Sequence, residues 1–300
     1  MPELPDVTVY IDALRSRLVG RVLEKVRIKS PSALRTYDPS IFEAHGRTVA
    51  GLSRMGKRIV VDLDDELFLV IHLMIAGRFR YAKKGANPPG KMGLASFDFD
   101  TATLHLTEAS TKKRAGIWLV RGTAARDALD PGGLEPLEAT RDEFGARLVV
   151  ENRTLKRALT DPHLFSGIGN AYSDEILHAA RLSPTQLTRN LDDDETTRLH
   201  AAVVTTLEAW ISRLRDLYSD KFPTKVTAFR PDMAVHGKYG EPCPVCQTPV
   251  QRLIYASNEA NYCPTCQTNG KLLRDRGLSK LLKDDWPKTL EELEERRRGS

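Results

Sequence analysis

The sequence predicts an α+β protein with several domains, and three patterns along the chain lead to this prediction. Residues 5–19 predict an amphipathic helix, because Pro5 suits a first helical turn and apolar residues recur on one face. From Val22 to about Val120, short apolar runs alternate with turn-forming residues, which predicts a mainly antiparallel β domain with this helix across it. The rest of the chain has helical periodicity and a cysteine cluster, which predicts a second, helical domain with a metal-binding module.

The second half is separated from the β domain by residues 127–136 (DALDPGGLEP), whose turn formers predict a linker. The acidic run at 192–195 lies at a predicted helix start, where the helix dipole favours carboxylates, so we interpret it as a cap. Residues 222–239 predict a loop before the cysteines, and the charged tail 281–300 predicts either a solvated helix or a disordered end. The helices predicted between linker and loop span residues 140–149, 155–159, 171–180 and 193–214.

Composition narrows the classes of protein. The 300 residues suffice for two domains, and no apolar run approaches the roughly 20 residues of a membrane helix. Glu3 and Asp6 lie where a signal peptide has basic and then apolar residues, so a cytoplasmic or nucleoid-associated location is expected. The net charge is +5, and residues 221–283 contain ten Lys/Arg against four Asp/Glu. A solvated basic face explains such a stretch alone, but nucleic-acid binding becomes the better interpretation beside a cysteine cluster.

All four cysteines lie within one short window, in the pattern CPVC, sixteen residues, CPTC. Two thiolate pairs on two turns joined by a hairpin suit one tetrahedral Zn²⁺ held by Cys243, Cys246, Cys263 and Cys266. Two disulfides are the alternative, disfavoured in a chain without an export signal. Four thiolates leave the metal no open position, so its expected role is structural. Alone, this motif is compatible with a DNA-, RNA- or protein-binding finger.

The first residues, MPELPDV, form a candidate active site. Removal of methionine before proline would give Pro2 a free secondary amine, and an α-amino group has a pKa of about 8, so part of it is neutral near pH 7. Such an amine can attack a sugar C1′ atom and form an iminium, with Glu3 as general acid and base at the opening sugar. The alternative is that Pro2 and Glu3 merely begin a helix.

Three distant motifs together resemble the formamidopyrimidine-DNA glycosylase and endonuclease VIII family: MPELPDV, GIGN at residues 167–170 and GEPC…C…YC…CQ in the finger. The resemblance runs from Pro2 to about Gln267. It implies an N-terminal antiparallel β-sandwich, a helix–two-turns–helix domain, a β-hairpin zinc finger, and a monomer that excises oxidised bases from double-stranded DNA and cleaves abasic sites by β,δ-elimination. The implied regions are 1–126 (catalytic β-sandwich), 127–136 (linker), 137–220 (helix–two-turns–helix), 221–237 (lesion-capping loop), 238–272 (zinc finger) and 273–300 (charged extension).

The resemblance also assigns residues. Pro2 matches the family nucleophile, Glu3 the catalytic carboxylate and Lys57 a lysine that grips a phosphate beside the lesion, although a lone lysine in a strand pattern is more often solvated. Asn170 and Lys156 match phosphate-binding residues of the helix–two-turns–helix domain. The two glycines before Asn170 make physical sense there, because they let the backbone approach a phosphate at a helix N-terminus.

Three departures from the family pattern affect specificity. Residues 72–77 resemble the wedge loop of the family, whose apolar side chain fills the hole that a flipped base leaves. Met74 and Ile75 stand in this loop where purine-specific enzymes have Gly-Met. Arg114 matches the intercalating arginine, but Ala115 replaces the usual phenylalanine, which predicts weaker discrimination among opposite bases. Asn258 replaces the arginine of the finger. The missing charge has alternative sources in Arg252 or in the cations after the last cysteine, Lys271, Arg274 and Arg276.

Two other functions compete with a bifunctional glycosylase. A damage-binding paralogue with weak catalysis would explain the altered wedge and finger, but it has no need of Pro2 and Glu3. A zinc-finger transcription factor leaves the same two residues unexplained. The sequence does not specify the lesion among oxidised purines, oxidised pyrimidines and bulkier adducts, although residues 218–231 are predicted to cover the flipped base.

Overall fold

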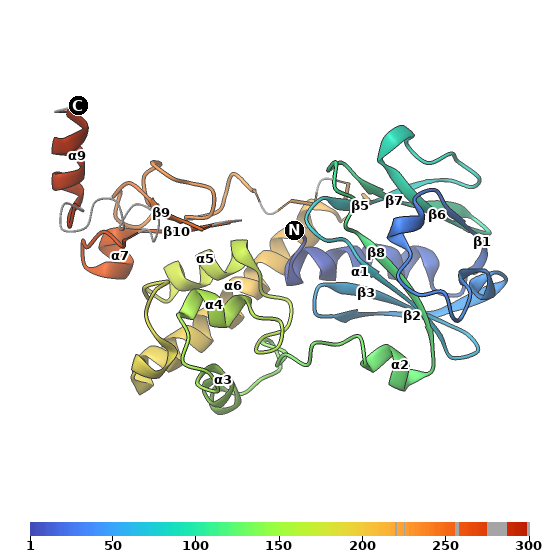
Figure 1. The fold of residues 1–300 in the computed structure, drawn as a ribbon, viewed down its shortest axis with the longest axis horizontal. Helices are drawn as coiled ribbons and strands as arrows, with labels where there is room; N and C mark the ends of the chain where they lie inside the picture. Colours follow the sequence, from blue (N-terminus) through green and yellow to red (C-terminus); the bar gives the residue numbers. More distant parts are fainter. Residues whose placement is uncertain (220, 225, 228, 256–257, 275–286, 299–300) are drawn as a thin grey trace. The chain divides into compact units, whose positions relative to one another are not determined.

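The chain, seen in a computed structural model, divides into two compact units (Figure 1). Unit 1 comprises residues 1–132 and 209–228, and unit 2 comprises residues 133–208 and 229–300. The structure describes all residues except 220, 225, 228, 256–257, 275–286 and 299–300, so Arg276 and part of the tail lie outside it.

Unit 1 begins with helix α1 (Leu4–Leu18), which confirms the helix predicted over residues 5–19. Pro5 lies in the first turn, and Glu3 and Asp6 form a reciprocal capping box that satisfies free backbone groups at the helix start. One apolar face of α1 is buried, including Tyr10 and Leu14 at 0% exposure. The helix therefore covers the β core while its N-terminus remains the place where polar groups gather.

The strands of unit 1 form one antiparallel network in the order β5-β7-β6-β1-β2-β3-β4-β8. Strands β1 and β2 share only two paired positions, Val22 with Thr48 and Leu23 with Arg47, so the network bends there into the two layers of a β-sandwich. One apolar core fills it, with residues from both layers and α1. The strands are β1 (Val22–Ile28), β2 (Arg47–Met55), β3 (Arg58–Leu63), β4 (Leu67–His72), β5 (Gly77–Lys83), β6 (Gly93–Phe99), β7 (Ala102–Glu108) and β8 (Gly116–Arg121), followed by helix α2 (Thr123–Asp127).

Unit 2 is helical before the finger, as its periodicity predicts. The acidic run is a cap as interpreted, because Asp192 Oδ1 accepts the backbone N–H of Glu195 at 2.7 Å at the start of α6. The helices are α3 (Arg141–Leu148), α4 (Leu155–Thr160), α5 (Asn170–Ala179) and α6 (Asp193–Leu217), and the last continues from unit 2 into unit 1. The finger region contains strands β9 (Gln251–Ile254) and β10 (Glu259–Tyr262) and helix α7 (Pro264–Thr268), and the tail contains helix α9 (Leu290–Arg298).

The segment after α6 returns to unit 1. The ring of Phe222 stacks on Tyr81 with centroids 5.6 Å apart, and Val226 joins the core of unit 1 with 2% exposure. The first part of the predicted lesion-capping loop is therefore anchored by apolar packing. Among the described residues, no helix combines the length and apolar character required to cross a bilayer.

Candidate active site and zinc centre

The N-terminal site is built around the start of α1. Glu3 and Asp6 are each 1% exposed, and the Glu3 backbone N–H donates to Asp6 Oδ2 at 3.0 Å. The positive end of the helix dipole favours carboxylates at this place, which offsets part of the cost of burying them. Pro2 is buried beside them, and its nitrogen is still acylated by Met1 in this chain.

Cations from two other elements reach this site. Lys57 lies in the turn between β2 and β3, and Arg78 lies at the start of β5. The pKa of the Met1 amine is lowered, and burial is the largest cause. The positive charges of Arg78 and Lys57 lower this pKa further, whereas the negative charges of Glu3 and Asp6 raise it. Glu3, Lys57 and Arg78 thus all act on the same amine, and no local motif in the sequence indicated Arg78.

The predicted wedge loop connects β4 to β5. Ile75 is 59% exposed at its tip, and Met74 has a left-handed backbone with φ of 53°. The turn is tight, because a Cβ at Gly77 would lie 2.1 Å from the Leu73 carbonyl oxygen. At its base, the backbone N–H of Met74 donates to His72 Nδ1 at 3.0 Å. Burial, followed by Arg58 and Lys57, lowers the pKa of His72 to about 4, so this acceptor stays neutral at physiological pH.

A buried carboxylate that sequence reasoning missed holds the loop between β7 and β8, which contains Arg114 and Ala115. Glu108 is 1% exposed at the end of β7, and its Oε2 accepts the backbone N–H groups of Arg114 at 2.8 Å and Ala115 at 3.0 Å. Arg114 is exposed, but Ala115 is 1% exposed within the core of unit 1. The side chain of Ala115 therefore does not stand beside Arg114 as a shortened wedge. An acidic residue that ends an apolar strand before the basic loop KKR was the available signal for Glu108.

Lys156 is buried where α4 packs against α5. It is 5% exposed, and its Nζ donates to Asp174 Oδ1 and to the Asn170 carbonyl oxygen, both at 2.6 Å. His236 Nδ1 lies 2.7 Å from the other oxygen of Asp174. A buried ammonium needs such partners, so these contacts of Lys156 stabilise the packing of α4 against α5. The assignment of Lys156 to a phosphate contact stays a prediction.

Asn170 begins α5, where the prediction requires a helix N-terminus. Its Nδ2 donates to the Glu259 carbonyl oxygen of β10 at 3.0 Å. Its Oδ1 is buried without a hydrogen-bond partner among the described residues. The side chain thus links the helix start to the finger hairpin, and its backbone N–H belongs to the first turn of the helix, the part of a helix that can bind an anion.

The four cysteines form a ready donor set for one metal ion. Their Sγ atoms all lie within 4.8 Å of one another, with 3.3 Å between Cys246 and Cys263 and 3.9 Å between Cys243 and Cys266. These separations are too long for disulfides, whose sulfurs are about 2.05 Å apart. They bracket the roughly 3.8 Å between thiolates around tetrahedral Zn²⁺ with bonds of about 2.3 Å. The residues therefore fit one structural zinc ion.

The finger hairpin has one exposed asparagine and one stacked arginine. Asn258 is exposed, and its carbonyl oxygen accepts the backbone N–H of Tyr255 at 2.8 Å. Arg252 lies with its guanidinium carbon 4.3 Å from the centroid of the Tyr239 ring, and its Nη1 lies 3.2 Å from Glu259 Oε2. Asn258 thus shapes the turn, whereas Arg252 supplies a positive charge on the hairpin.

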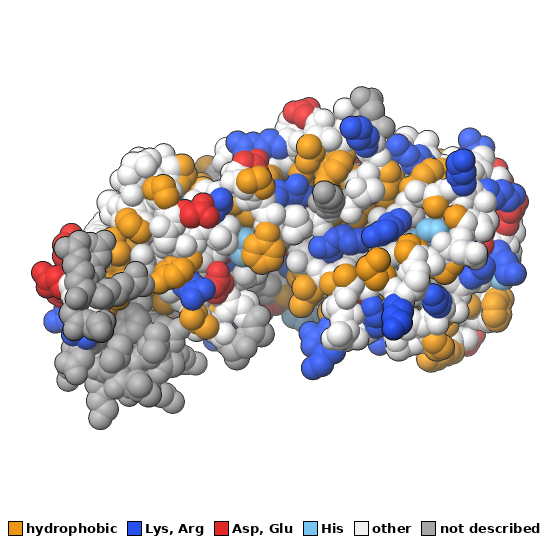
Figure 2. All heavy atoms as spheres, turned by 90° about the horizontal axis from the view of Figure 1, so that it is seen from above, with side chains coloured by type: hydrophobic (Ala, Val, Ile, Leu, Met, Phe, Trp, Pro, Cys, Tyr) orange, Lys and Arg blue, Asp and Glu red, His pale blue; other side chains and the backbone are white. Residues whose placement is uncertain are grey.

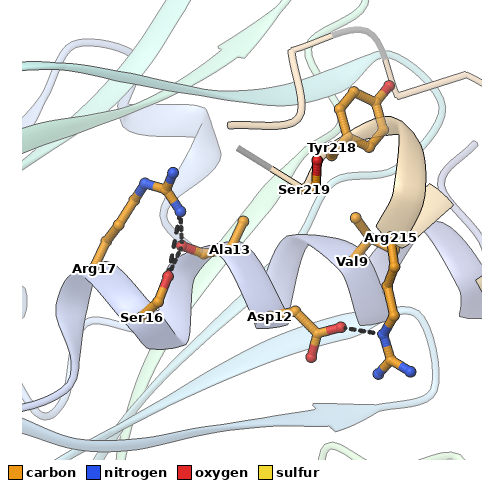
Figure 3. Close-up of a pocket in the computed structure, with 8 residues that line it drawn as sticks. All are labelled: Val9, Asp12, Ala13, Ser16, Arg17, Arg215, Tyr218 and Ser219. Atoms are coloured by element: carbon orange, nitrogen blue, oxygen red, sulfur yellow. Dashed lines mark hydrogen bonds and ion pairs between the residues drawn. The ribbon is translucent and has the colours of Figure 1, made fainter. Parts of the chain in front are cut away.

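A polar pocket lies within unit 1, away from these predicted residues. It has a volume of about 290 Å³ and is lined by α1 and the end of α6. Figure 3 shows Arg215 pointing to Asp12, to which its Nε donates at 2.8 Å. This contact fastens the end of α6 to α1. On the face of unit 1 seen in Figure 2, Lys and Arg side chains predominate over Asp and Glu, which suits a polyanion.

Comparisons with known proteins find matches to one family along most of the chain. Residues 1–115 match the formamidopyrimidine-DNA glycosylase N-terminal domain, residues 133–219 the H2TH domain of the same family, and residues 240–269 the zinc finger found in FPG and IleRS. The chain is 32% identical over 277 residues to a formamidopyrimidine-DNA glycosylase of Chloroflexus aurantiacus, which covers 89% of this chain and 98% of that protein.

Two solved structures of the Lactococcus lactis protein Fpg are similar as well. One is a complex with DNA that contains an abasic site, with a TM-score of 0.78 and 25% identity over 89% of this chain and 99% of the other. The second is a mutant of that protein with DNA that contains Fapy-dG, with a TM-score of 0.79 and 26% identity over 89% and 100% of the two chains.

Proposed function

Because this chain belongs to the formamidopyrimidine-DNA glycosylase family, we propose that its N-terminal cluster is the catalytic site of base-excision repair. The protein is a DNA glycosylase with the AP lyase activity typical of this family. Its partner is double-stranded DNA with damaged bases or abasic sites, bound by a single chain. The observation that carries the site is the convergence of Glu3, Lys57 and Arg78 on the chain terminus.

Pro2 is the proposed nucleophile after Met1 is removed. Its nitrogen would then be a secondary amine next to the groups that now lower the pKa of the Met1 amine, with burial first among the causes. A lowered pKa leaves more of the amine neutral near pH 7, as attack on carbon requires. The Pro2 nitrogen bonds to C1′ of the damaged nucleotide, the bond from C1′ to the base breaks, and the base leaves with a proton.

Glu3 is the proposed general acid and base in this sequence of steps. It protonates the ring oxygen O4′ as the sugar opens, and the electron pair of nitrogen then forms the iminium with C1′. Removal of a proton from C2′ expels the 3′ phosphate, and a second elimination expels the 5′ phosphate. The carboxylate is held for this role by the start of α1, because the capping box orients it against its own helix.

The other predicted residues are assigned to DNA contacts. We propose that Lys57 and Arg78 contact a phosphate beside the lesion. Arg78 Nη1 also donates to the Ile75 carbonyl oxygen at 3.2 Å, which supports the loop between β4 and β5. Ile75, with Met74, and Arg114 fill the space of the flipped nucleotide. Support comes from the exposure of Ile75 and Arg114, each in a loop between two strands.

Unit 2 contributes a phosphate site and the zinc finger. We assign Asn170 and the N-terminus of α5 to a phosphate, and Asn258 to the DNA side of the finger hairpin. One Zn²⁺ holds the finger together and takes no part in the reaction; its ligands are Cys243, Cys246, Cys263 and Cys266. We propose residues 127–136 as the linker, which is supported by the unit boundary after residue 132. We also propose that the enzyme is located in the cytoplasm, associated with the nucleoid.

Borohydride trapping on a duplex with one abasic site tests this proposal. Processed protein should form a covalent adduct, Pro2→Gly should form less, and protein that retains Met1, verified by mass spectrometry, should form none. Lys57→Ala is the matched control, because it removes an amine while it leaves Pro2 in place, and it should still trap. Undiminished trapping with Met1 present would move the nucleophile to a lysine. Binding without trapping by processed protein would indicate the damage-binding alternative.

A further inference from the structure

One face of α5 is bonded along its length to the finger and the segment before it. Its contacting residues are four apart, so they lie above one another on the helix. Each bonds a different part of the region from residue 236 to residue 259. The contacts join Asn170 to the carbonyl of Glu259 at 3.0 Å, Asp174 to His236 at 2.7 Å, and His178 to Cys243 at 3.3 Å.

The last of these contacts reaches a zinc ligand. His178 is 7% exposed, Cys243 is 0% exposed, and 3.3 Å separates the imidazole Nε2 from Sγ. A thiolate that binds a metal carries no proton, so this sulfur is then an acceptor only. The hydrogen of the contact must therefore come from the imidazole, in the tautomer that is protonated on Nε2.

The burial of two of the four thiolates explains why such a donor is needed. Four thiolates around a divalent ion leave a net charge of −2 on the site, which buried sulfurs cannot share with water. Cys246 and Cys266 are partly exposed, whereas Cys243 and Cys263 are buried. Sγ of Cys263 receives the backbone N–H of Cys266 at 3.5 Å within the finger, and Sγ of Cys243 receives its contact from α5.

We propose that His178 is a positioning residue of the zinc centre, which donates Nε2–H to the Cys243 thiolate and slows the release of the metal. The hydrogen bond offsets negative charge on sulfur and holds the ligand in the tetrahedral arrangement. Because the same helix face carries Asn170 at its start, metal retention and the placement of Asn170 share one element. The stability of the finger then depends on a side chain outside it.

Zinc release to a colorimetric chelator tests this inference without DNA or catalysis, so its outcome is independent of the proposed function. His178→Leu removes the donor and should release zinc roughly 10-fold faster than the wild type. His178→Gln places an amide N–H near the former Nε2 atom and should stay within about 3-fold, since the donor is retained. His200→Leu is the matched control, because its Nε2 lies 3.0 Å from the Ala139 carbonyl oxygen in the same unit, and it should not change the rate.

Equal release from wild type and His178→Leu would overturn the proposal, as would His178→Gln releasing zinc as fast as His178→Leu. If His178→Leu does not fold, NMR of the wild-type protein with zinc bound still tests the proposal. A long-range ¹H–¹⁵N spectrum should show His178 protonated on Nε2 alone. Protonation on Nδ1 alone would exclude the hydrogen bond.

Discussion

The N-terminal cluster of unit 1 and the α5 network of unit 2 both bury charged side chains, but they satisfy them in different ways. In unit 2, Lys156 and Asp174 meet at 2.6 Å, and Asp174 also contacts His236, so each charge is matched by direct partners. In unit 1, Glu3 and Asp6 cap their own helix, and they affect the chain terminus through space.

This difference separates charges that hold the fold from charges available to a reaction. Breaking a fully paired buried network costs stability, so its members are fixed and their charges are used within the protein. Carboxylates at a helix start are stabilised by backbone N–H groups and the helix dipole of their own helix. A charged residue that matches a family motif therefore needs its partners known before a role is assigned, as Lys156 illustrates.

Replacement of Glu3 by glutamine should give the largest effect on the N-terminal side of this comparison. The amide keeps the shape but cannot transfer a proton, so single-turnover base excision should fall by about 10²–10⁴-fold. Cleavage of a preformed abasic site should fall less, because the base is already lost and protonation of the sugar matters most for its excision. Asp6→Asn is the control for the loss of a capping carboxylate. Equal losses in both steps would assign Glu3 to the lyase reaction or to the fold.

In the α5 network of unit 2, Lys156→Met should give the largest effect, which is a loss of stability. It leaves Asp174 buried without its ammonium partner, so the free energy of unfolding should fall by about 3–5 kcal/mol. Urea denaturation measures this change, and Asp174→Asn in the same chain should restore part of it. Lys57→Met, in a turn, should instead reduce DNA affinity with little change in stability. A stable Lys156→Met protein with a weaker salt dependence of DNA binding would restore its assignment to a phosphate.

The fold and the metal site could be predicted because their signals are contiguous in the sequence. The helix after Pro5 follows from a spacing within a few turns, and the zinc site follows from two CxxC pairs in one short window. The family resemblance supplied the role of Glu3, and its burial at a helix start agrees with that role without testing it.

The remainder depended on contacts between distant residues. Lys156 is paired with a residue 18 positions later, which no local pattern reveals. Ala115 lies in the core because its backbone N–H is hydrogen-bonded to Glu108. The sequence of the loop alone does not predict the orientation of the Ala115 side chain. His178 reaches Cys243 across 65 residues, so its role required the packing of α5 on the finger.

His72 should make stability depend on pH in unit 1. Its pKa is lowered from 6.5 to about 4 in the folded chain, chiefly by burial. Between these values the unfolded chain binds more protons, so stability is fully present above pH 6.5 and is lost as pH falls toward 4, by at most about 3 kcal/mol. Urea unfolding at pH 7.5 and pH 5 measures the loss.

His72→Asn sharpens this test, because its Oδ1 can accept the Met74 backbone N–H but does not titrate. The variant should show a smaller difference between the two pH values, while His72→Leu should also lose stability at pH 7.5 through an unsatisfied N–H. An unchanged pH dependence in His72→Asn would assign the acid sensitivity to other groups.

Asn258→Arg should give the smallest effect, which is on DNA binding. This variant tests whether another residue of the hairpin already contacts the phosphate. If the site is free, the added charge should tighten binding to lesion DNA and steepen the slope of log K against log salt by about 0.9. Arg252 is the competing source of charge, held on Tyr239 and beside Glu259. If Asn258→Arg weakens binding with no change in slope, Arg252 occupies the site, and Arg252→Ala should then make the slope shallower by a similar amount. Zinc content should stay at one ion per chain in each variant, because neither side chain is a ligand.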